Sequence, residues 1–403
     1  MSSPIFSVGD LNNNRFPTEN IGNDNLTNAA SPPLGANLMF LTKLKLQSFR
    51  SHAEVQLNFK AKLVFFIGEN GAGKTNIIEA INQFATLKSF RDNSDEELVN
   101  WNSNFYYIKG DLVSEEMNKT IEIGYSKADS LKRKVKLNGE IIQKKQDIIG
   151  ELKAVVFSPV DLKIIDGGPS ERRRFIDSFI STVNRSYFAN ILDYNKILKH
   201  RNTLLKKKDF SQSELAPWDQ MLVKKGVEIA KERARVIDII NQIYKENLAK
   251  LSGEKDKFEV VYKPNVVNND EYANKLAERV SRDTHLGYTS VGIHRDDIFV
   301  GTNGKDIIEF GSQGQKRSTV IALKTSQFKF IQNQIGEAPI LLIDDVIREL
   351  DVKRREYFVN LIIDCGQAFF TTTDLEGIQD YLGNLEEAKQ VFVIQDGNIS
   401  ELS

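Results

Sequence analysis

Eight consecutive residues carry the clearest chemical signal in the sequence: Gly68, Glu69, Asn70, Gly71, Ala72, Gly73, Lys74 and Thr75. They follow the apolar run 63–67 and precede an amphipathic run that begins at Asn76. A strand, a glycine-rich turn and a helix form the context in which GxxxxGK[ST] cradles phosphate through backbone N–H groups. We expect Lys74 to reach the β- and γ-phosphates of ATP and Thr75 to offer its hydroxyl to Mg²⁺. A glycine turn with a chance Lys-Thr pair is the weaker interpretation, given these flanks.

Two carboxylates, Asp344 and Asp345, end a second apolar run at 339–343. One carboxylate can support a metal ion and the other can orient the attacking water, which is what a nucleotide hydrolase needs. The alternative is a polar turn at the end of a strand. Upstream, Ser312, Gln313, Gly314 and Gln315 precede a predicted helix over 316–334, and its N-terminus could form a second phosphate-binding end.

The middle of the chain, from Glu171 to about Arg282, is predicted to be helical, with breaks near Pro217, Gly226 and Gly253. Ser170 is predicted to cap the first of these helices. Between residues 196 and 235 there are eleven Lys or Arg and five Asp or Glu, including Lys206, Lys207 and Lys208. This stretch is either a contact surface for the phosphate backbone of DNA or an ordinary solvated helical face.

Several shorter segments predict strands. Alternating patterns at 39–46 and 53–59 predict an edge hairpin that leads into a buried strand at 63–67. Those at 106–113, 120–125 and 135–137 predict further strands, with Asn138-Gly139 as a hairpin turn. Residues 154–157 predict a short buried strand, and 289–293 and 298–300 two more. A metal site at 294–297 is conceivable from His294, Asp296 and Asp297, but neighbouring strand residues point to opposite faces, which argues against convergent ligands.

Composition sets the broad class. With 403 residues, 40% hydrophobic and 27% charged, the chain has ample core for two or three domains. The net charge of −1 gives no global attraction to polyanions, and the single Cys365 excludes an internal disulfide. No apolar run approaches the length of a membrane span, so we expect a cytoplasmic protein. Residues 1–38 hold eight asparagines and four of the nine prolines, which predicts a disordered leader.

These motifs together resemble a known family. Ser312 to Gln315, followed at the appropriate spacing by Asp344, resembles the signature and metal-binding segments of ATP-binding-cassette ATPases, and Asp351 matches their D-loop. Segments 49–50, 68–76, 156–159, 172–177, 292–297, 312–317 and 344–346 resemble the RecF family of bacterial recombinational-repair ATPases. The resemblance implies an α/β fold: an ABC/SMC-type P-loop ATPase head with a mixed sheet, an inserted mainly helical lid and no long coiled coil.

The resemblance also implies partners and roles. Such proteins bind DNA as ATP-dependent homodimers, favour single-/double-stranded junctions, and work with RecR and RecO in loading recombinase. Residues 68–76 would bind ATP and Mg²⁺, and Ser312 to Gln315 would close over the γ-phosphate held by a second copy. Asp344 would support the metal, Asp345 would polarise water, and Asp351 would report across the dimer. Asp345 and Thr373 replace the usual Glu and the switch His, so we expect weak, DNA-dependent ATP hydrolysis that serves as a switch.

Two other classes remain as alternatives: the energising subunit of a transporter and a nuclease-linked ATPase. The length of the lid and the lack of apolar spans argue against the first, and the short stretch after Asp351 argues against the second. The predicted organisation is a leader (1–38), the N-terminal half of the head (39–170), the helical lid (171–285) and the C-terminal half of the head (286–403).

Overall fold

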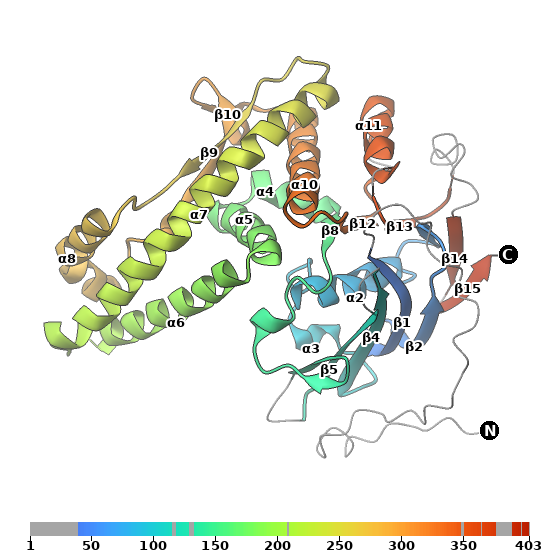
Figure 1. Cartoon of the computed structure of the whole chain (residues 1–403), viewed down its shortest axis with the longest axis horizontal. Helices are drawn as coiled ribbons and strands as arrows, with labels where there is room; N and C mark the ends of the chain where they lie inside the picture. Colours follow the sequence, from blue (N-terminus) through green and yellow to red (C-terminus); the bar gives the residue numbers. More distant parts are fainter. Residues whose placement is uncertain are drawn as a thin grey trace. The chain divides into compact units, whose positions relative to one another are not determined.

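The computed structural model describes residues 39–114, 118–128, 133–207, 209–347, 350–363, 365–375, 389–395 and 397–402. The predicted leader at 1–38 lies outside these residues. Two compact units divide the chain. Unit 1 contains residues up to 158 together with 337–349 and 362–403, and unit 2 contains 159–336 and 350–361. Figure 1 labels the elements of both units.

Unit 1 contains a mainly parallel sheet in which segments far apart in the sequence become neighbours. Its strand order is β15-β14-β3-β13-β12-β8, and all pairs except β14–β15 are parallel. The strands are β3 (Leu63–Ile67), β8 (Ala154–Phe157), β12 (Ile340–Asp344), β13 (Ala368–Thr372), β14 (Lys389–Gln395) and β15 (Asn398–Leu402). Parallel strands bring their carboxyl ends to one edge, so the ends of β3 and β12 lie at the same edge.

The second sheet of unit 1 is antiparallel, and it joins the predicted edge hairpin to the strands predicted at 106–113, 120–125 and 135–137. Its order is β2-β1-β4-β5-β6-β7. The strands are β1 (Phe40–Phe49), β2 (His52–Asn58), β4 (Phe105–Val113), β5 (Asn118–Ser126), β6 (Arg133–Leu137) and β7 (Glu140–Ile141). Asn138 and Gly139 both have positive φ in the β6–β7 turn, which confirms the predicted hairpin.

Helix α2 (Lys74–Thr86) contacts strands of both sheets, namely β1 and β4 on one side and β12 and β13 on the other. It is therefore buried around its circumference, including Glu79, whose carboxylate forms a bidentate ion pair with Arg50. The close approach of α2 to β4 depends on Gly110, because a Cβ there would lie 2.7 Å from Phe84. A short helix, α3 (Asp95–Leu98), follows α2.

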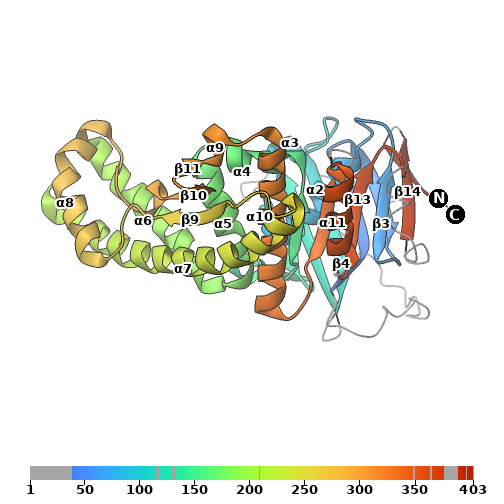
Figure 2. The same cartoon turned by 90° about the horizontal axis from the view of Figure 1, so that it is seen from above.

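Unit 2 is mainly helical. Its helices are α4 (Lys163–Asp166), α5 (Pro169–Val183), α6 (Arg185–Lys207), α7 (Gln212–Ser252), α8 (Asn269–Leu286), α9 (Ile307–Phe310), α10 (Gln313–Ile335) and α11 (Val352–Ile363). The 41-residue α7 packs beside α6 and α8, and also against α10 (Figures 1 and 2). A small sheet, β11-β10-β9, is formed by β9 (Glu259–Lys263), β10 (Asp297–Thr302) and β11 (Lys305–Asp306).

The predicted helical region was wrong in three details. Pro217 and Gly226 do not interrupt α7, which ends at Gly253 with φ of 64°. Pro217 is exposed near the N-terminus of α7, and Gly226 provides room for Tyr272, which a Cβ would approach to 2.7 Å. The third error is the missed strand β9, which pairs with β10 through Val261 and Phe299.

The predicted strand at 289–293 was also wrong. Its backbone N–H groups donate to side chains instead of a neighbouring strand: Thr289 to Asn202 (2.8 Å), Ser290 to Asp283 (3.1 Å) and Gly292 to Asn265 (2.9 Å). These side chains satisfy the backbone donors, so no ladder is required. The predicted cap was wrong as well, because α5 begins at Pro169 with Gly168 as its N-cap. Pro is well suited to the first helical position.

The compact units group the chain differently from the predicted domains. Residues 286–336 and 350–361 lie in unit 2 with the long helices, whereas the sequence grouped them with the C-terminal half of the head. The predicted division into two head halves and a lid stays a prediction.

Candidate nucleotide-binding site

The phosphate loop runs from the end of β3 into α2, as predicted. Gly71 and Gly73 have φ of 86° and 107°, a region that favours glycine. Space also excludes a side chain: a Cβ on Gly73 would lie 2.6 Å from the hydroxyl of Ser51, and one on Gly68 would lie 2.3 Å from the Ile394 carbonyl. The loop therefore presents backbone at a helix N-terminus, which suits phosphate oxygens.

Lys74 lies inside this loop. Its Nζ donates hydrogen bonds to the carbonyl oxygens of Gly68 (2.9 Å) and Glu69 (3.0 Å), and the residue is only 3% exposed. Both acceptors are neutral, so the ammonium can exchange them for charged phosphate oxygens, which bind it more strongly.

Thr75 and Asp344 come together from opposite ends of the chain. The Thr75 hydroxyl donates to Asp344 Oδ1 at 2.7 Å, and the Thr371 hydroxyl donates to the same oxygen at 2.8 Å. The parallel pairing of β12 with β13, and of β13 with β3, places these residues at one sheet edge. The predicted relation between the phosphate loop and the strand-end carboxylate is present in the geometry.

The two adjacent aspartates differ in environment. Asp344 is buried, and this burial raises the pKa of its carboxyl group, while the bonds from Thr75 and Thr371 partly offset that rise. Asp345 has φ of 52°, and its N–H donates to the hydroxyl and the carbonyl of Thr371. Asp is among the residues that tolerate this left-handed conformation.

The donor set fits Mg²⁺. A hydroxyl and a carboxylate are hard oxygen ligands, and Mg²⁺ in nucleotide sites typically uses one or two protein groups with phosphates and water. Among the described residues, the structure contains no group of three or more His, Cys, Asp or Glu side chains that could hold a metal ion.

Two residues beside the phosphate loop were missed by the sequence analysis. His52 is buried, with Nε2 3.1 Å from the Gly73 carbonyl, and the Asn76 amide donates to Ser51 Oγ at 2.9 Å. Burial lowers the pKa of His52. The two missed residues, Ser51 and His52, lie where β1 turns into β2, before β3. Their only sequence signal was proximity to the resemblance at 49–50.

The Ser312 segment forms the predicted helix start in unit 2. Ser312 is the N-cap of α10: its Oγ accepts from the Gln315 N–H at 3.2 Å, and Gln315 Oε1 accepts from the Ser312 N–H at 2.9 Å. A hydroxyl that accepts this bond keeps its proton for donation. Ser312 and Gln313 are exposed, and Gly314 and Gln315 are half-buried. Asp351 caps α11 by accepting from the Arg354 N–H at 2.9 Å.

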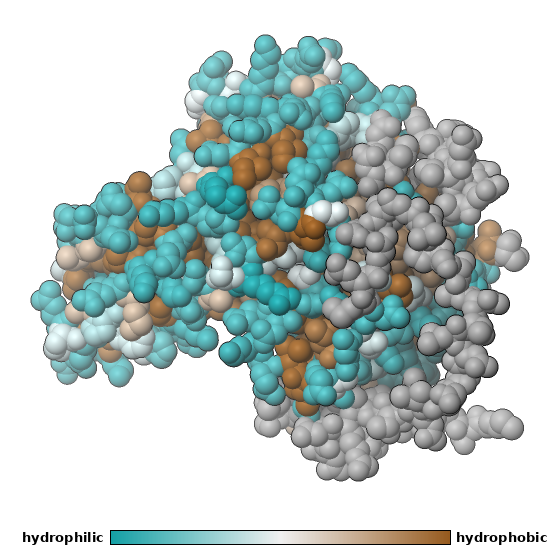
Figure 3. Space-filling model, viewed as in Figure 1, coloured by the Kyte–Doolittle hydropathy of each residue, from teal (hydrophilic) through white to brown (hydrophobic). Residues whose placement is uncertain are grey.

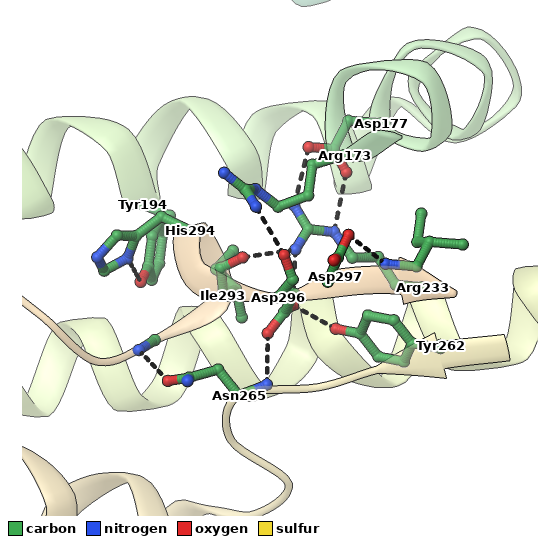
Figure 4. Close-up of polar contacts among 12 residues, drawn as sticks. Arg173, Asp177, Tyr194, Arg233, Tyr262, Asn265, Ile293, His294, Asp296 and Asp297 are labelled. Atoms are coloured by element: carbon green, nitrogen blue, oxygen red, sulfur yellow. Dashed lines mark hydrogen bonds and ion pairs between the residues drawn. The ribbon is translucent and has the colours of Figure 1, made fainter. Parts of the chain in front are cut away.

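The 294–297 tetrad is part of a buried polar network in unit 2 (Figure 4). Arg233 donates to Asp296 at 2.7 Å and forms a bidentate ion pair with Asp177. Asp296 also accepts from the Asn265 N–H at 2.8 Å and from the Tyr262 hydroxyl. This aspartate is thus committed to protein donors.

The other members of the tetrad are committed in the same way. Asp297 accepts two bonds from Arg172, at 2.8 and 3.0 Å. His294 lies between the Thr289 carbonyl, 3.0 Å from Nε2, and the Tyr194 hydroxyl, 2.9 Å from Nδ1. A carbonyl only accepts, so Nε2 carries the proton and Nδ1 accepts from Tyr194. The tetrad is a structural junction, in agreement with the argument against a metal site.

The candidate DNA-contacting residues separate into two groups. Arg201 and Arg233 are buried in ion pairs, and Lys225 and Arg235 pair with Asp193 and Glu232. Exposed lysines of α6 recur at helical spacing on one face, which we call the α6 stripe: Lys196, Lys199, Lys206 and Lys207. Figure 3 shows mainly hydrophilic side chains over α6. The predicted Lys208 lies outside the described residues.

The helices show no sign of a membrane segment: within the described parts of the chain, none has the length and apolar character needed to span a bilayer.

Comparisons with known proteins agree on one relationship. The sequence model of the RecF/RecN/SMC N terminal domain matches residues 40–399. The DNA replication and repair protein RecF of Leptospira interrogans serogroup Icterohaemorrhagiae serovar Lai is 53% identical over 364 residues, covering 90% of this chain and 100% of that protein. RecF of Natranaerobius thermophilus is 36% identical over 384 residues, covering 91% and 99%.

Solved structures give the same result. The structure of the recombination mediator protein RecF with ATP, in the RecFOR pathway, matches with a TM-score of 0.84 and 31% identity, covering 92% of this chain and 100% of that one. The Smc head domain of Pyrococcus furiosus, bound to a ScpA domain, matches with a TM-score of 0.51 and 19% identity over 91% and 97%. The second match supports the fold alone, and the predicted ABC/SMC-type head is confirmed.

Proposed function

The chain belongs to the RecF family of DNA replication and repair proteins, and from this we propose that it is an ATP-dependent DNA-binding protein of recombinational repair. In this proposal two copies pair when ATP is bound, and the pair recognises gapped or junction DNA and helps to load recombinase. Slow, DNA-stimulated ATP hydrolysis acts as the switch that releases the pair. RecR and RecO are the proposed protein partners.

The observation that carries the proposal is the hydrogen bond from Thr75 to Asp344. It joins the phosphate loop to a buried strand-end carboxylate, and that combination is what a nucleotide-metal site requires. Thr75 and Asp344 would hold Mg²⁺, which neutralises phosphate charge when bound. Lys74 would turn from the Gly68 and Glu69 carbonyls to the phosphates, and Asp345 would orient water.

A second copy would supply Ser312 to Gln315. The exposure of Ser312 and Gln313 supports this role, since an interface residue must be accessible before pairing. The α6 stripe supports the DNA-binding part of the proposal, because its four lysines are exposed on one face of the helix. Such lysines contact phosphates without reading sequence.

Two measurements on the full chain test the proposal. Sedimentation velocity with ATP and Mg²⁺ should show a dimer, and binding of gapped, duplex and single-stranded DNA at two salt concentrations should be strengthened by ATP. Gapped DNA should bind best. Lys74→Met is the matched control, and it should neither pair nor respond to ATP. If sedimentation shows nothing but monomers at saturating ATP and Mg²⁺, the proposal is overturned.

A further inference from the structure

Arg354, near the start of α11, donates hydrogen bonds to three groups. Two of them belong to the proposed pairing surface, and the third lies next to it. Its Nη2 donates to the Gly314 carbonyl at 2.9 Å, and its Nε donates to Ser318 Oγ at 2.9 Å. Its Nη1 donates to the Asp351 carboxylate. One guanidinium group therefore joins the first turn of α10 to the residue that caps α11.

The first turn of α10 is shaped for this contact. A Cβ on Gly314 would lie 3.3 Å from Arg354 Nη2, which is tighter than most Cβ contacts, so glycine lets the guanidinium reach the carbonyl without displacement. Ser318 lies one turn further along α10 and is 1% exposed. Its hydroxyl thus has a fixed position when it accepts from Arg354.

Two further bonds hold the same turn from other directions. Gln315 Nε2 donates to Asp256 at 2.8 Å, and Lys316 Nζ donates to Asp166 at 2.8 Å. Ser312 and Gln313 remain exposed at the tip of this braced turn. The arrangement fixes the backbone and leaves accessible the residues that would meet a second copy, which is how a preorganised binding surface is built.

We propose that Arg354 is a positioning residue that makes Asp351 and the Ser312–Gln315 turn one preformed surface for ATP-dependent pairing. This inference rests on the proposed function. Arg354 touches no phosphate in this role: it aligns the groups that would close over the nucleotide of a second copy. Loss of Arg354 should weaken pairing, while ATP binding by the phosphate loop of the single chain should be unchanged.

The chemistry favours arginine over lysine. The three acceptors lie around a planar fork, and an ammonium group on a flexible stem cannot address all three in fixed directions. Arg354→Lys keeps the charge and most of the packing, so it separates positioning from charge. It should pair more weakly than wild type and more strongly than Arg354→Ala.

The test measures the dimer dissociation constant by sedimentation with ATP and Mg²⁺, beside binding of a fluorescent ATP analogue to dilute monomer. We expect Arg354→Ala to raise the dimer dissociation constant about 10- to 100-fold, the range of one or two lost charge-assisted bonds. Analogue binding should change less than about 2-fold, well below the effect of one such bond. Asp351→Ala should have a similar effect, and the double variant should fall short of the product of the two.

Arg235→Ala is the matched control, because Arg235 also bonds an acidic residue three positions away on a helix of unit 2. Thermal unfolding identifies any variant that fails to fold. If Arg354→Ala does not fold, the test uses Arg354→Lys. If wild type pairs and both Arg354 variants pair equally well, the inference is overturned and the proposed function stands. If wild type does not pair, both are overturned.

Discussion

The two adjacent aspartates at the end of β12 lie in different environments, and we therefore expect different roles for them. Asp344 is buried and accepts hydroxyl bonds from Thr75 and Thr371, which fixes its carboxylate toward the phosphate loop. Asp345 adopts positive φ, a conformation that Asp and Asn tolerate better than Glu. Backbone geometry thus gives a physical reason for the shorter acid at this position.

Asp345→Asn separates pairing from hydrolysis. Asn fits the same backbone conformation, so the fold and ATP binding should be retained, but the amide cannot polarise water as a carboxylate does. We expect ATP turnover to fall by about 100-fold or more, within the usual range for a lost general base, and the ATP-bound dimer to persist. Phosphate release and sedimentation measure the two effects. Turnover near the wild-type rate would remove Asp345 from the proposed mechanism.

His294 should make the protein sensitive to acid. Burial lowers its pKa from 6.5 to about 4, so between these values the unfolded chain takes up a proton that the folded chain does not. The free energy of unfolding should therefore fall as the pH falls, by about 2 kcal/mol between pH 7 and pH 5 from this group.

His294→Gln tests this assignment, because its amide can still donate to Thr289 and accept from Tyr194. Urea unfolding at both pH values should show a smaller loss for the variant. Equal losses in variant and wild type would exclude His294 as the source.

Helix α6 presents its basic stripe because its other face is committed to packing. Tyr194, Ile197, Arg201 and Leu205 recur at helical spacing and are buried. The exposed lysines therefore form a line of positive charge along the opposite face. For such a surface, binding should depend strongly on salt and weakly on base sequence.

Lys206→Gln combined with Lys207→Gln should weaken binding to every DNA probe and lower the salt slope by about one unit per lysine. Fluorescence anisotropy at several salt concentrations measures both. Lys224→Gln combined with Lys231→Gln on α7 removes the same charge from another helix and is the control. If the two double variants behave alike, net charge and not the α6 stripe governs binding.

The elements that the sequence predicted well are those determined by local patterning. Alternation identified individual strands of the antiparallel sheet, and the strand–loop–helix order identified the phosphate loop. The errors occur where distant side chains replace local structure, as when Asn202, Asp283 and Asn265 satisfy the backbone at 289–292. The same holds at the site: Ser51, His52 and Arg354 act through contacts that form only in the folded chain, and the resemblance at 49–50 was the one sequence signal near the first two.

The complete chain divides the proposed machinery between its two compact units. The phosphate loop and Asp344 lie in unit 1, and Ser312, Asp351 and the α6 stripe lie in unit 2. The chain passes from one unit to the other more than once, so neither unit is a continuous segment. Function is therefore expected only from the full chain.

Removing divalent cation should reverse pairing. If Thr75 and Asp344 hold Mg²⁺ beside ATP, excess EDTA leaves phosphate charge uncompensated near a buried carboxylate. The dimer formed with ATP and Mg²⁺ should return to monomer, and added Mg²⁺ should restore it, as followed by light scattering after chromatography. A dimer that survives EDTA would show that pairing does not depend on the metal.

The length of α7 has a mechanical consequence. At 41 residues, α7 extends about 60 Å and packs beside α6. Near its C-terminal end, Asn247 bonds to Ser326 of α10 and to Tyr357 of α11. If DNA binds along the α6 stripe, a load applied there would be transmitted along one unbroken helix to the middle of α10, whose N-terminus is capped by Ser312. DNA binding at one end and dimer pairing at the other would then be coupled by the stiffness of a single helix.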